Sequence, residues 1–234
     1  DGAQHITYTL HPTGTPGSCT SYNNTARIVE TTGDEASATA ELCVGSDVKV
    51  TKKASGSYDR TYLWSLDKSV DSAAQNIGAG ETATFSYSVT ATPQGYADSN
   101  WTMGGTITVT NPNLWQDVEV SVADVTTLGA TCTIDGNVPT VTVPKNDKVV
   151  LGYTCVFGAE PKYTGTNTAT VTWDATAAHT PTASASDTVD VAAAVKTETN
   201  KTVTMTDSRY GTLGEVTYPD TLTKSYSLPF DGTA

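Results

Sequence analysis

The chain contains the same short strand pattern twice, near its two ends. Residues 6–10 read Ile-Thr-Tyr-Thr-Leu and residues 224–228 read Lys-Ser-Tyr-Ser-Leu, which places the two tyrosines at an offset of 226 − 8 = 218 positions. Similar segments at a fixed offset are the mark of a repeated structural unit. We therefore expect the chain to cover one long period and a short overlap.

A looser echo lies inside that period. The stretch 118–124 and the Leu-Gly that follows it resemble 203–207 and its following Leu-Gly, while 167–171 resembles 24–28. We expect residues 46–191 to form one complete domain. Residues 1–45 and 192–234 are then expected to be the C-terminal and N-terminal parts of a related, split domain.

Composition predicts an all-β chain. Hydrophobic residues make up 37% and charged residues 16% of the chain. Threonine, serine, alanine, valine and glycine dominate, and β-branched residues suit a pleated surface. Turn signals recur about every ten residues, as in antiparallel sandwiches. The net charge of −12 argues against a nucleic-acid partner, and no apolar run is long enough to cross a bilayer.

Four cysteines fall into two local pairs, Cys19 with Cys43 and Cys132 with Cys155. Neither pair has the close spacing of a metal-binding motif, and the three histidines are scattered. We therefore expect two disulfides, no metal and no cofactor. Oxidised cysteines predict an extracellular or cell-surface location.

One predicted strand, residues 61–70, places a lysine on its apolar face. The alternation puts Lys68 on the same side as four hydrophobic residues: Tyr62, Trp64, Leu66 and Val70. A buried ammonium group is costly unless it is paired, neutralised or consumed in a reaction. The pattern therefore marks Lys68 as a candidate functional residue.

An acid and a carboxamide interrupt two further apolar faces. Asp124 continues the inward register of Val118, Val120 and Val122, and Asn167 begins that of Ala169, Val171 and Trp173. Lysine, acid and asparagine are the groups that an autocatalytic isopeptide bond requires, with Asp124 as the acid that joins Lys68 to Asn167. The alternative is an ordinary ion pair of Lys68 with Asp124, with Asn167 closing a turn.

The split domain carries a partial copy of this set. Asp207 and Asn24 match the acid and the asparagine of the echoing segments. Its lysine stays open among Lys52, Lys196 and Lys201. Lys52 shares the inward register of the valines before it, but it follows Asn24 in sequence, where the pattern requires a lysine that comes earlier.

The ordered set of motifs resembles a known family. The Lys68 strand, the segments 78–87 and 108–113, the strand ending at Asp124 and the segment 167–171 are similar to Ig-like repeats of unknown function. These repeats occur in tandem in large bacterial and archaeal surface proteins. The chain also resembles the stalk domains of Gram-positive pilins and adhesins. The resemblance implies tandem Ig-like β-sandwiches, exported and strung in arrays, with an isopeptide bond from Lys68 to Asn167.

Three functional classes follow from these patterns. The leading prediction is a structural repeat of a surface stalk or filament, which contacts copies of itself or adjacent repeats head to tail. The alternative is an adhesin or glycan-binding module, with Trp101 and Trp115 as a possible sugar platform. A secreted hydrolase fits worst, because no catalytic triad or pair of loop carboxylates is evident.

Overall fold

The chain folds almost entirely into β-strands, as predicted. The computed structural model describes residues 4–29, 33–137, 140–158 and 160–233. Its helices are a single turn, α1 (Ala175–Ala178), and a short 3-10 segment, η1 (Asp135–Asn137). In the described part of the chain, no helix has both the length and the apolar character that a membrane crossing requires.

Two compact units share the chain, and two long strands run through both. Unit 1 comprises residues up to Gly56 and Thr102–Ala193, and unit 2 comprises Ser57–Trp101 and the residues from Ala194 onward. The long strands are β3 (Lys49–Val70) and β4 (Thr82–Asn111).

The division of the chain differs from the predicted one. Residues 57–101 were expected inside a complete domain spanning 46–191, but they belong with the residues from 194 onward. The cause is strand length: 49–70 and 82–111 each continue without a break from one unit into the other. The sequence pattern indicated two shorter strands in each place.

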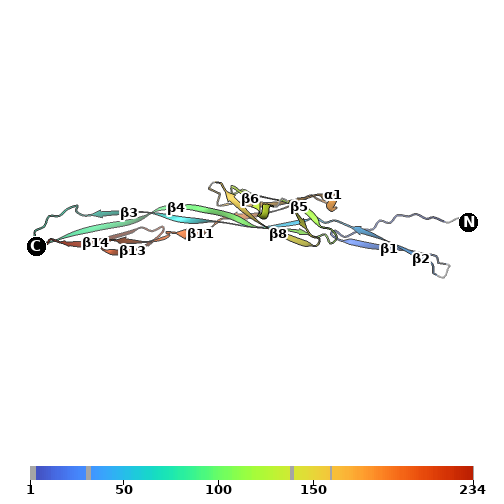
Figure 1. Ribbon diagram of the computed structural model, residues 1–234, viewed down its shortest axis with the longest axis horizontal. Coiled ribbons are helices and arrows are strands. Elements are labelled where there is room, and N and C mark those ends of the chain that lie inside the picture. Colours follow the sequence, from blue (N-terminus) through green and yellow to red (C-terminus); the bar gives the residue numbers. More distant parts are fainter. Residues whose placement is uncertain (1–3, 30–32, 138–139, 159, 234) are drawn as a thin grey trace. The chain divides into compact units, whose positions relative to one another are not determined.

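The sandwich of unit 1 is built from two sheets. The first has the order β10-β9-β5-β7, and the second contains β3, β4, β8 and β6 in that order. Figure 1 labels the two long strands β3 and β4. The remaining strands of the sandwich are β5 (Val118–Thr126), β6 (Ala130–Ile134), β7 (Thr140–Val143), β8 (Asp147–Phe157), β9 (Thr164–Trp173) and β10 (Ser184–Ala192). Pairing is antiparallel between β5 and β9, β5 and β7, β4 and β8, and β6 and β8.

Both sheets of unit 1 contribute to one hydrophobic core. Alternating residues of β5 and β9 face alternating residues of β4 and β8, including Val120, Val171, Ile107 and Tyr153. Burying each of these side chains fully stabilises the fold by about 1.5–3 kcal/mol. The alternation read from the sequence is therefore the inward face of the sandwich.

Unit 2 has a smaller core. The first part of β4 pairs antiparallel with β14 (Leu222–Asp231), and β11 (Ala194–Thr199) pairs parallel with β3. A hairpin of β12 (Thr202–Asp207) and β13 (Gly211–Thr217) forms a separate two-stranded sheet. Six buried residues form the core: Val89, Ala91, Met205, Leu213, Val216 and Tyr226.

The N-terminal hairpin consists of β1 (Cys19–Arg27) and β2 (Glu35–Cys43), which pair with each other in a two-stranded sheet. Most of its side chains beyond the first residues of β1 are exposed. The expected strand at residues 6–10 is absent, and this prediction was wrong. No neighbouring strand among the described residues receives its backbone hydrogen bonds, so the apolar alternation alone does not make a strand there.

Both predicted disulfides are confirmed. The sulfur atoms lie 2.01 Å apart in Cys19–Cys43 and 2.02 Å apart in Cys132–Cys155. In each case the two cysteines are directly opposite in an antiparallel pair, β1 with β2 and β6 with β8. Each bond therefore fixes the register of the two strands that it joins.

Candidate functional site

Unit 1 contains a buried ion pair. Nζ of Lys52 on β3 lies 2.6 Å from Oδ1 of Asp124 on β5, and the two side chains are 0% and 1% exposed. Lys52 follows the inward register of Val48 and Val50 on the same strand. Two opposite charges are thus held inside the hydrophobic core.

Tyr153 on β8 brings an asparagine to this pair. The Lys52 Nζ lies 3.6 Å from the centroid of the Tyr153 ring. The Nδ2 of Asn167, on β9, donates a hydrogen bond to the Tyr153 hydroxyl at 3.2 Å. In the β5–β9 register, Asp124 is opposite Ala169, so Asp124 and Asn167 are diagonal neighbours on one face. We call Lys52, Asp124, Tyr153 and Asn167 the closed site.

Two oxygen atoms of the closed site lack a hydrogen-bond donor. Oδ2 of Asp124 and Oδ1 of Asn167 are both buried and have no hydrogen-bond partner. Buried unpartnered acceptors are rare because each costs about 1–3 kcal/mol. These two acceptors are therefore the unsatisfied polar atoms of the closed site.

Burial favours the neutral amine form of Lys52. Desolvation lowers the pKa of Lys52, while the hydrogen bond and charge of Asp124 oppose this change. Desolvation likewise raises the pKa of Tyr153 to about 12, so its hydroxyl stays protonated. Because a neutral amine is a nucleophile and an ammonium group is not, this environment suits Lys52 for attack on a carbonyl carbon.

The lysine predicted for this site was wrong. Lys68 belongs to unit 2, its side chain is 45% exposed, and its Nζ lies 2.6 Å from Oδ2 of Asp207. Tyr62 is buried and Trp64 half-buried, as the alternation predicts, but Leu66 and Lys68 are exposed. The inward face of β3 is thus open beyond Trp64. The alternation correctly predicted which side of β3 Lys68 takes. The assumption that other residues cover that side was wrong.

Lys68 forms a second cluster in unit 2, which we call the open site: Lys68, Asp207 and Tyr226. The Tyr226 hydroxyl donates to Oδ2 of Asp207 at 2.8 Å, and Lys68 Nζ lies 5.8 Å from the Tyr226 ring centroid. The hydrogen bond from Lys68 holds the pKa of Asp207 well below its usual range, helped by the backbone N–H of Tyr210. The same bond raises the pKa of Lys68.

The other residues considered for the split domain have different roles. Of the three lysines left open, Lys52 belongs to the closed site, Lys201 pairs with Glu198 at 2.9 Å, and Lys196 lies on exposed β11. Asn24 lies on β1, where its Nδ2 donates to the Tyr8 hydroxyl. The structure thus gives Asp207 a lysine that the sequence analysis had assigned elsewhere.

The roles of Tyr153 and Tyr226 in the two sites were not predicted from the sequence. Residues 149–157 read Val-Val-Leu-Gly-Tyr-Thr-Cys-Val-Phe, and 222–230 read Leu-Thr-Lys-Ser-Tyr-Ser-Leu-Pro-Phe. Both segments, β8 and β14, pair antiparallel with β4. Tyr153 and Tyr226 occupy matching positions in them. The shared tyrosine and phenylalanine spacing was the signal that could have found them.

The two tryptophans proposed as a sugar platform lie in different units. In unit 2, Trp101 stacks on Tyr58 with the ring centroids 4.4 Å apart. In unit 1, the Trp115 ring lies 5.8 Å from the His179 ring. Both are half-buried and face aromatic neighbours of their own unit. This arrangement is that of packing residues.

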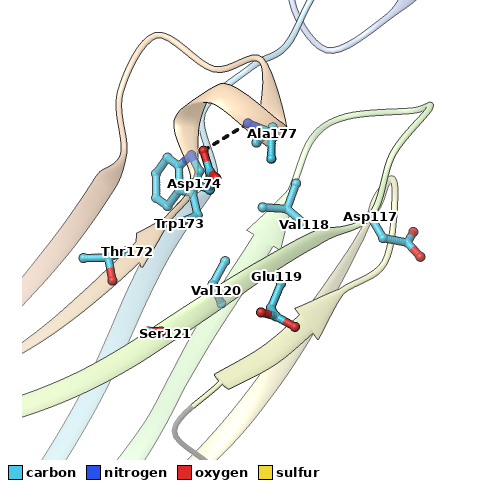
Figure 2. A pocket seen from close by; sticks show the side chains of 10 residues that line it. Asp117, Val118, Glu119, Val120, Ser121, Thr172, Trp173, Asp174 and Ala177 are labelled. Carbon is cyan, nitrogen blue, oxygen red and sulfur yellow. Dashed lines mark hydrogen bonds between the residues drawn. The ribbon is translucent and has the colours of Figure 1, made fainter.

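A surface pocket of unit 1 lies between β5 and the end of β9 (Figure 2). Acidic residues at its rim include Asp117, Glu119 and Asp174. The Asp174 carboxylate accepts hydrogen bonds from the backbone N–H groups of Thr176 and Ala177, and so caps α1. Asp174 therefore serves as the N-cap of α1.

Comparison with family models, curated proteins and solved structures found no match for the chain. Its function is therefore argued from its own geometry.

Proposed function

We propose that the chain is a structural repeat of an extracellular stalk or filament, built of Ig-like sandwiches. The closed site is the observation that carries this proposal: Lys52 and Asp124 form a 2.6 Å contact with both side chains sealed from solvent. A buried ion pair contributes little net stability, because desolvation offsets the attraction. A covalent bond between the strands that carry Lys52 and Asn167 would instead resist unfolding under load.

The chemistry balances without a cofactor. A proton passes from Lys52 Nζ to Asp124, which leaves a neutral amine beside a carboxylic acid. The amine attacks Cγ of Asn167, so that the Nζ–Cγ bond forms while Asp124 protonates the amide oxygen. As the tetrahedral intermediate collapses, that proton reaches Nδ2, Nζ gives its second proton to the Asp124 carboxylate, the Cγ–Nδ2 bond breaks and ammonia leaves. The product is a secondary amide that joins β3 to β9.

Three features of the site support this sequence of steps. Burial lowers the pKa of Lys52, the unpartnered Oδ2 of Asp124 is placed to hold a proton, and the Tyr153 hydroxyl contacts the nitrogen that departs. The Tyr153 contact also fixes the Asn167 amide against rotation. The bond would join β3 of one sheet of unit 1 to β9 of the other.

The disulfides support the extracellular part of the proposal. Both pairs join strands of unit 1, and disulfides persist in oxidising compartments. With the isopeptide bond, unit 1 would carry three covalent ties, one of them between the two sheets of its sandwich. A glycan-binding role has less support, because Trp101 and Trp115 each pack inside their own unit.

Intact mass of the non-reduced chain tests the proposal. Each isopeptide bond removes one ammonia, and each disulfide removes two hydrogens. We expect the wild-type monomer to lack one ammonia, and Lys52→Met and Asn167→Ala to regain it. Lys53→Met, which changes the exposed neighbour of Lys52, is the matched control and should keep the deficit. A folded wild type with both disulfides and the full mass of its side chains would refute the bond.

A further inference from the structure

The open site repeats the closed site with one member missing. Lys68 matches Lys52, Asp207 matches Asp124, and Tyr226 matches Tyr153, in the same order along the chain and on corresponding strands. Both lysines lie 2.6 Å from their carboxylates. Among the described residues, no asparagine forms a hydrogen bond with Lys68, Asp207 or Tyr226, whereas Asn167 bonds to Tyr153.

The N-terminal hairpin carries the missing asparagine. Asn24 begins an Asn-Thr-Ala segment on β1, as Asn167 does on β9. Each strand continues into an antiparallel partner, β2 for β1 and β10 for β9. Asn24 also donates to a tyrosine hydroxyl, that of Tyr8, which is the residue 218 positions before Tyr226. The Asn24–Tyr8 contact is thus the counterpart of the Asn167–Tyr153 contact.

The same face of the hairpin is uncovered. In unit 1 the face of β9 that holds Asn167 also holds Ala169 and Val171, and all three are fully buried. The corresponding face of β1 holds Asn24 and Ala26, which are exposed. An open pocket lies on this side of the hairpin, lined by Leu10, Pro12, Tyr22, Asn24, Ala38 and Leu42 among others. A hairpin with a face of this kind lacks the sheet against which it would pack.

Unit 2 has the complementary deficiency. On the β3 face that holds Lys68, Leu66 is 65% exposed and Val70 is 39% exposed. The hairpin β12–β13 forms a two-stranded sheet, where unit 1 has a four-stranded one that includes β9 and β10. Two additional strands beside β12 would place an asparagine next to Asp207, as β9 places Asn167 next to Asp124. Both deficiencies are removed if the hairpin packs onto unit 2.

We propose that Asn24 of a second copy of this chain completes the open site, and that Lys68 then forms an intermolecular isopeptide bond with it. The inference rests on the cross-linking chemistry proposed for the closed site. The β1–β2 hairpin of the second copy covers the apolar face of β3, and Tyr226 replaces Tyr8 as the partner of Asn24. Lys68 Nζ first gives a proton to Asp207 and then bonds to Cγ of Asn24. Asp207 passes that proton to Nδ2, the Cγ–Nδ2 bond breaks and ammonia leaves, while the second proton of Nζ returns to the Asp207 carboxylate.

The reaction would begin when the hairpin of the second copy covers the open site. In the uncovered state Lys68 is half-exposed, and its ion pair with Asp207 holds the ammonium form. The docked hairpin would exclude water from both groups, as the sheets of unit 1 do for Lys52. Desolvation then favours the neutral amine and the neutral acid. A free chain would remain unreacted until it meets a partner hairpin.

Complementation between two single variants of the full chain tests this inference. Lys68→Met keeps Asn24 as a donor, and Asn24→Ala keeps Lys68 as an acceptor. We expect concentrated wild type to give a ladder of species that survive boiling in detergent and thiol, and each variant alone to give monomer. A mixture of the two variants should stop at the dimer, because its product has no further matching pair.

Controls separate this bond from the one in the closed site. Lys196→Met and Asn23→Ala change an exposed lysine of unit 2 and the neighbour of Asn24, and both should keep the ladder. Peptide mapping of the dimer should join Lys68 to Asn24, and Asp207→Ala in the acceptor should abolish the dimer. The monomer mass reports the Lys52–Asn167 bond independently, so either bond can fail alone.

Two results would overturn the inference. One is a mixture of folded variants, with both disulfides intact, that yields only monomer at high concentration. The other is a wild-type monomer that has lost ammonia between its own Lys68 and Asn24, which would make the hairpin an intramolecular partner.

Discussion

Lys52 and Asp124 meet at 2.6 Å in the interior of unit 1, and Lys68 and Asp207 meet at the same distance in unit 2. The two contacts differ in solvent access, since the lysine side chains are 0% and 45% exposed. Water stabilises the ammonium form of Lys68, while burial disfavours that of Lys52. Burial, rather than distance, therefore distinguishes the two ion pairs.

Removing the buried acid should destabilise unit 1 strongly. Asp124→Ala leaves Lys52 in the core without its carboxylate and removes the proton transfer on which the proposed isopeptide bond depends. Breaking a buried pair in this way costs about 3–5 kcal/mol. Urea denaturation, with mass spectrometry to confirm that ammonia is retained, measures the effect. Asp190→Ala, at an exposed position of β10, should change the midpoint little. Equal midpoints for the two variants would contradict the role of Asp124.

Acid should weaken unit 2 through Asp207. Its pKa is held below the ordinary value of about 3.9 by the hydrogen bond from Lys68 and by backbone N–H groups. A lowered folded-state pKa stabilises the fold above the unfolded-state value, and this stability is lost as the pH falls towards the folded-state value. The urea midpoint of wild type should therefore fall between pH 5 and about pH 2.

The matched variant Asp207→Asn should begin from a lower midpoint at pH 5 and fall less over the same interval. High salt should reduce the difference, because Lys68 is half-exposed and its charge is screened. Identical pH profiles for wild type and Asp207→Asn would rule out a contribution of this carboxylate to stability.

The sequence predicted the local features well and the long-range ones less well. Both disulfides, the strand that places Asp124 inward and the β9 face that holds Asn167 follow from alternation and spacing. The identity of the lysine that pairs with Asp124 did not follow from the sequence. Alternation predicts which side of a strand a residue takes, but not what covers that side. Lys52 and Lys68 lie on one continuous strand, β3, that serves two cores.

The predicted domain boundaries differ from the observed units for the same reason. A strand that passes from one core to another has no turn or break in pattern at the crossing. Residues 57–101 therefore appeared to belong to the complete domain. The split domain suggested by the repeat of Tyr8 as Tyr226 stays a prediction, because the residues up to Gly56 group with unit 1 and not with those from Ala194 onward.

Loss of the disulfide in the core of unit 1 should lower stability by about 3 kcal/mol, the value for a closed loop of roughly this length. Cys132 and Cys155 are 23 positions apart, and Cys155 is buried in the core. A double variant, Cys132→Ala with Cys155→Ala, tests this by urea denaturation. Its counterpart, Cys19→Ala with Cys43→Ala, affects the exposed hairpin and should leave the main transition less changed. If the Cys19→Ala, Cys43→Ala variant lost more stability than the Cys132→Ala, Cys155→Ala variant, the Cys132–Cys155 bond would not be the main disulfide that stabilises unit 1.

Two tyrosine-to-phenylalanine variants should change the rate of intermolecular cross-linking in opposite directions. In the proposed exchange, Asn24 leaves the hydroxyl of Tyr8 and reaches that of Tyr226 in the other copy. Tyr8→Phe removes the competing contact in the donor and should speed formation of the dimer. Tyr226→Phe keeps the ring but removes the hydroxyl that bonds Asp207, so it should slow the reaction.

The measurement is the rate at which detergent-resistant dimer appears when Lys68→Met donors meet Asn24→Ala acceptors, with each tyrosine changed in one partner. Placing Tyr8→Phe in the acceptor instead of the donor is the internal control, because the acceptor hairpin takes no part in that reaction and its rate should stay unchanged. Rates that respond equally in donor and acceptor would indicate a general change in folding, and would remove the two tyrosines from the exchange.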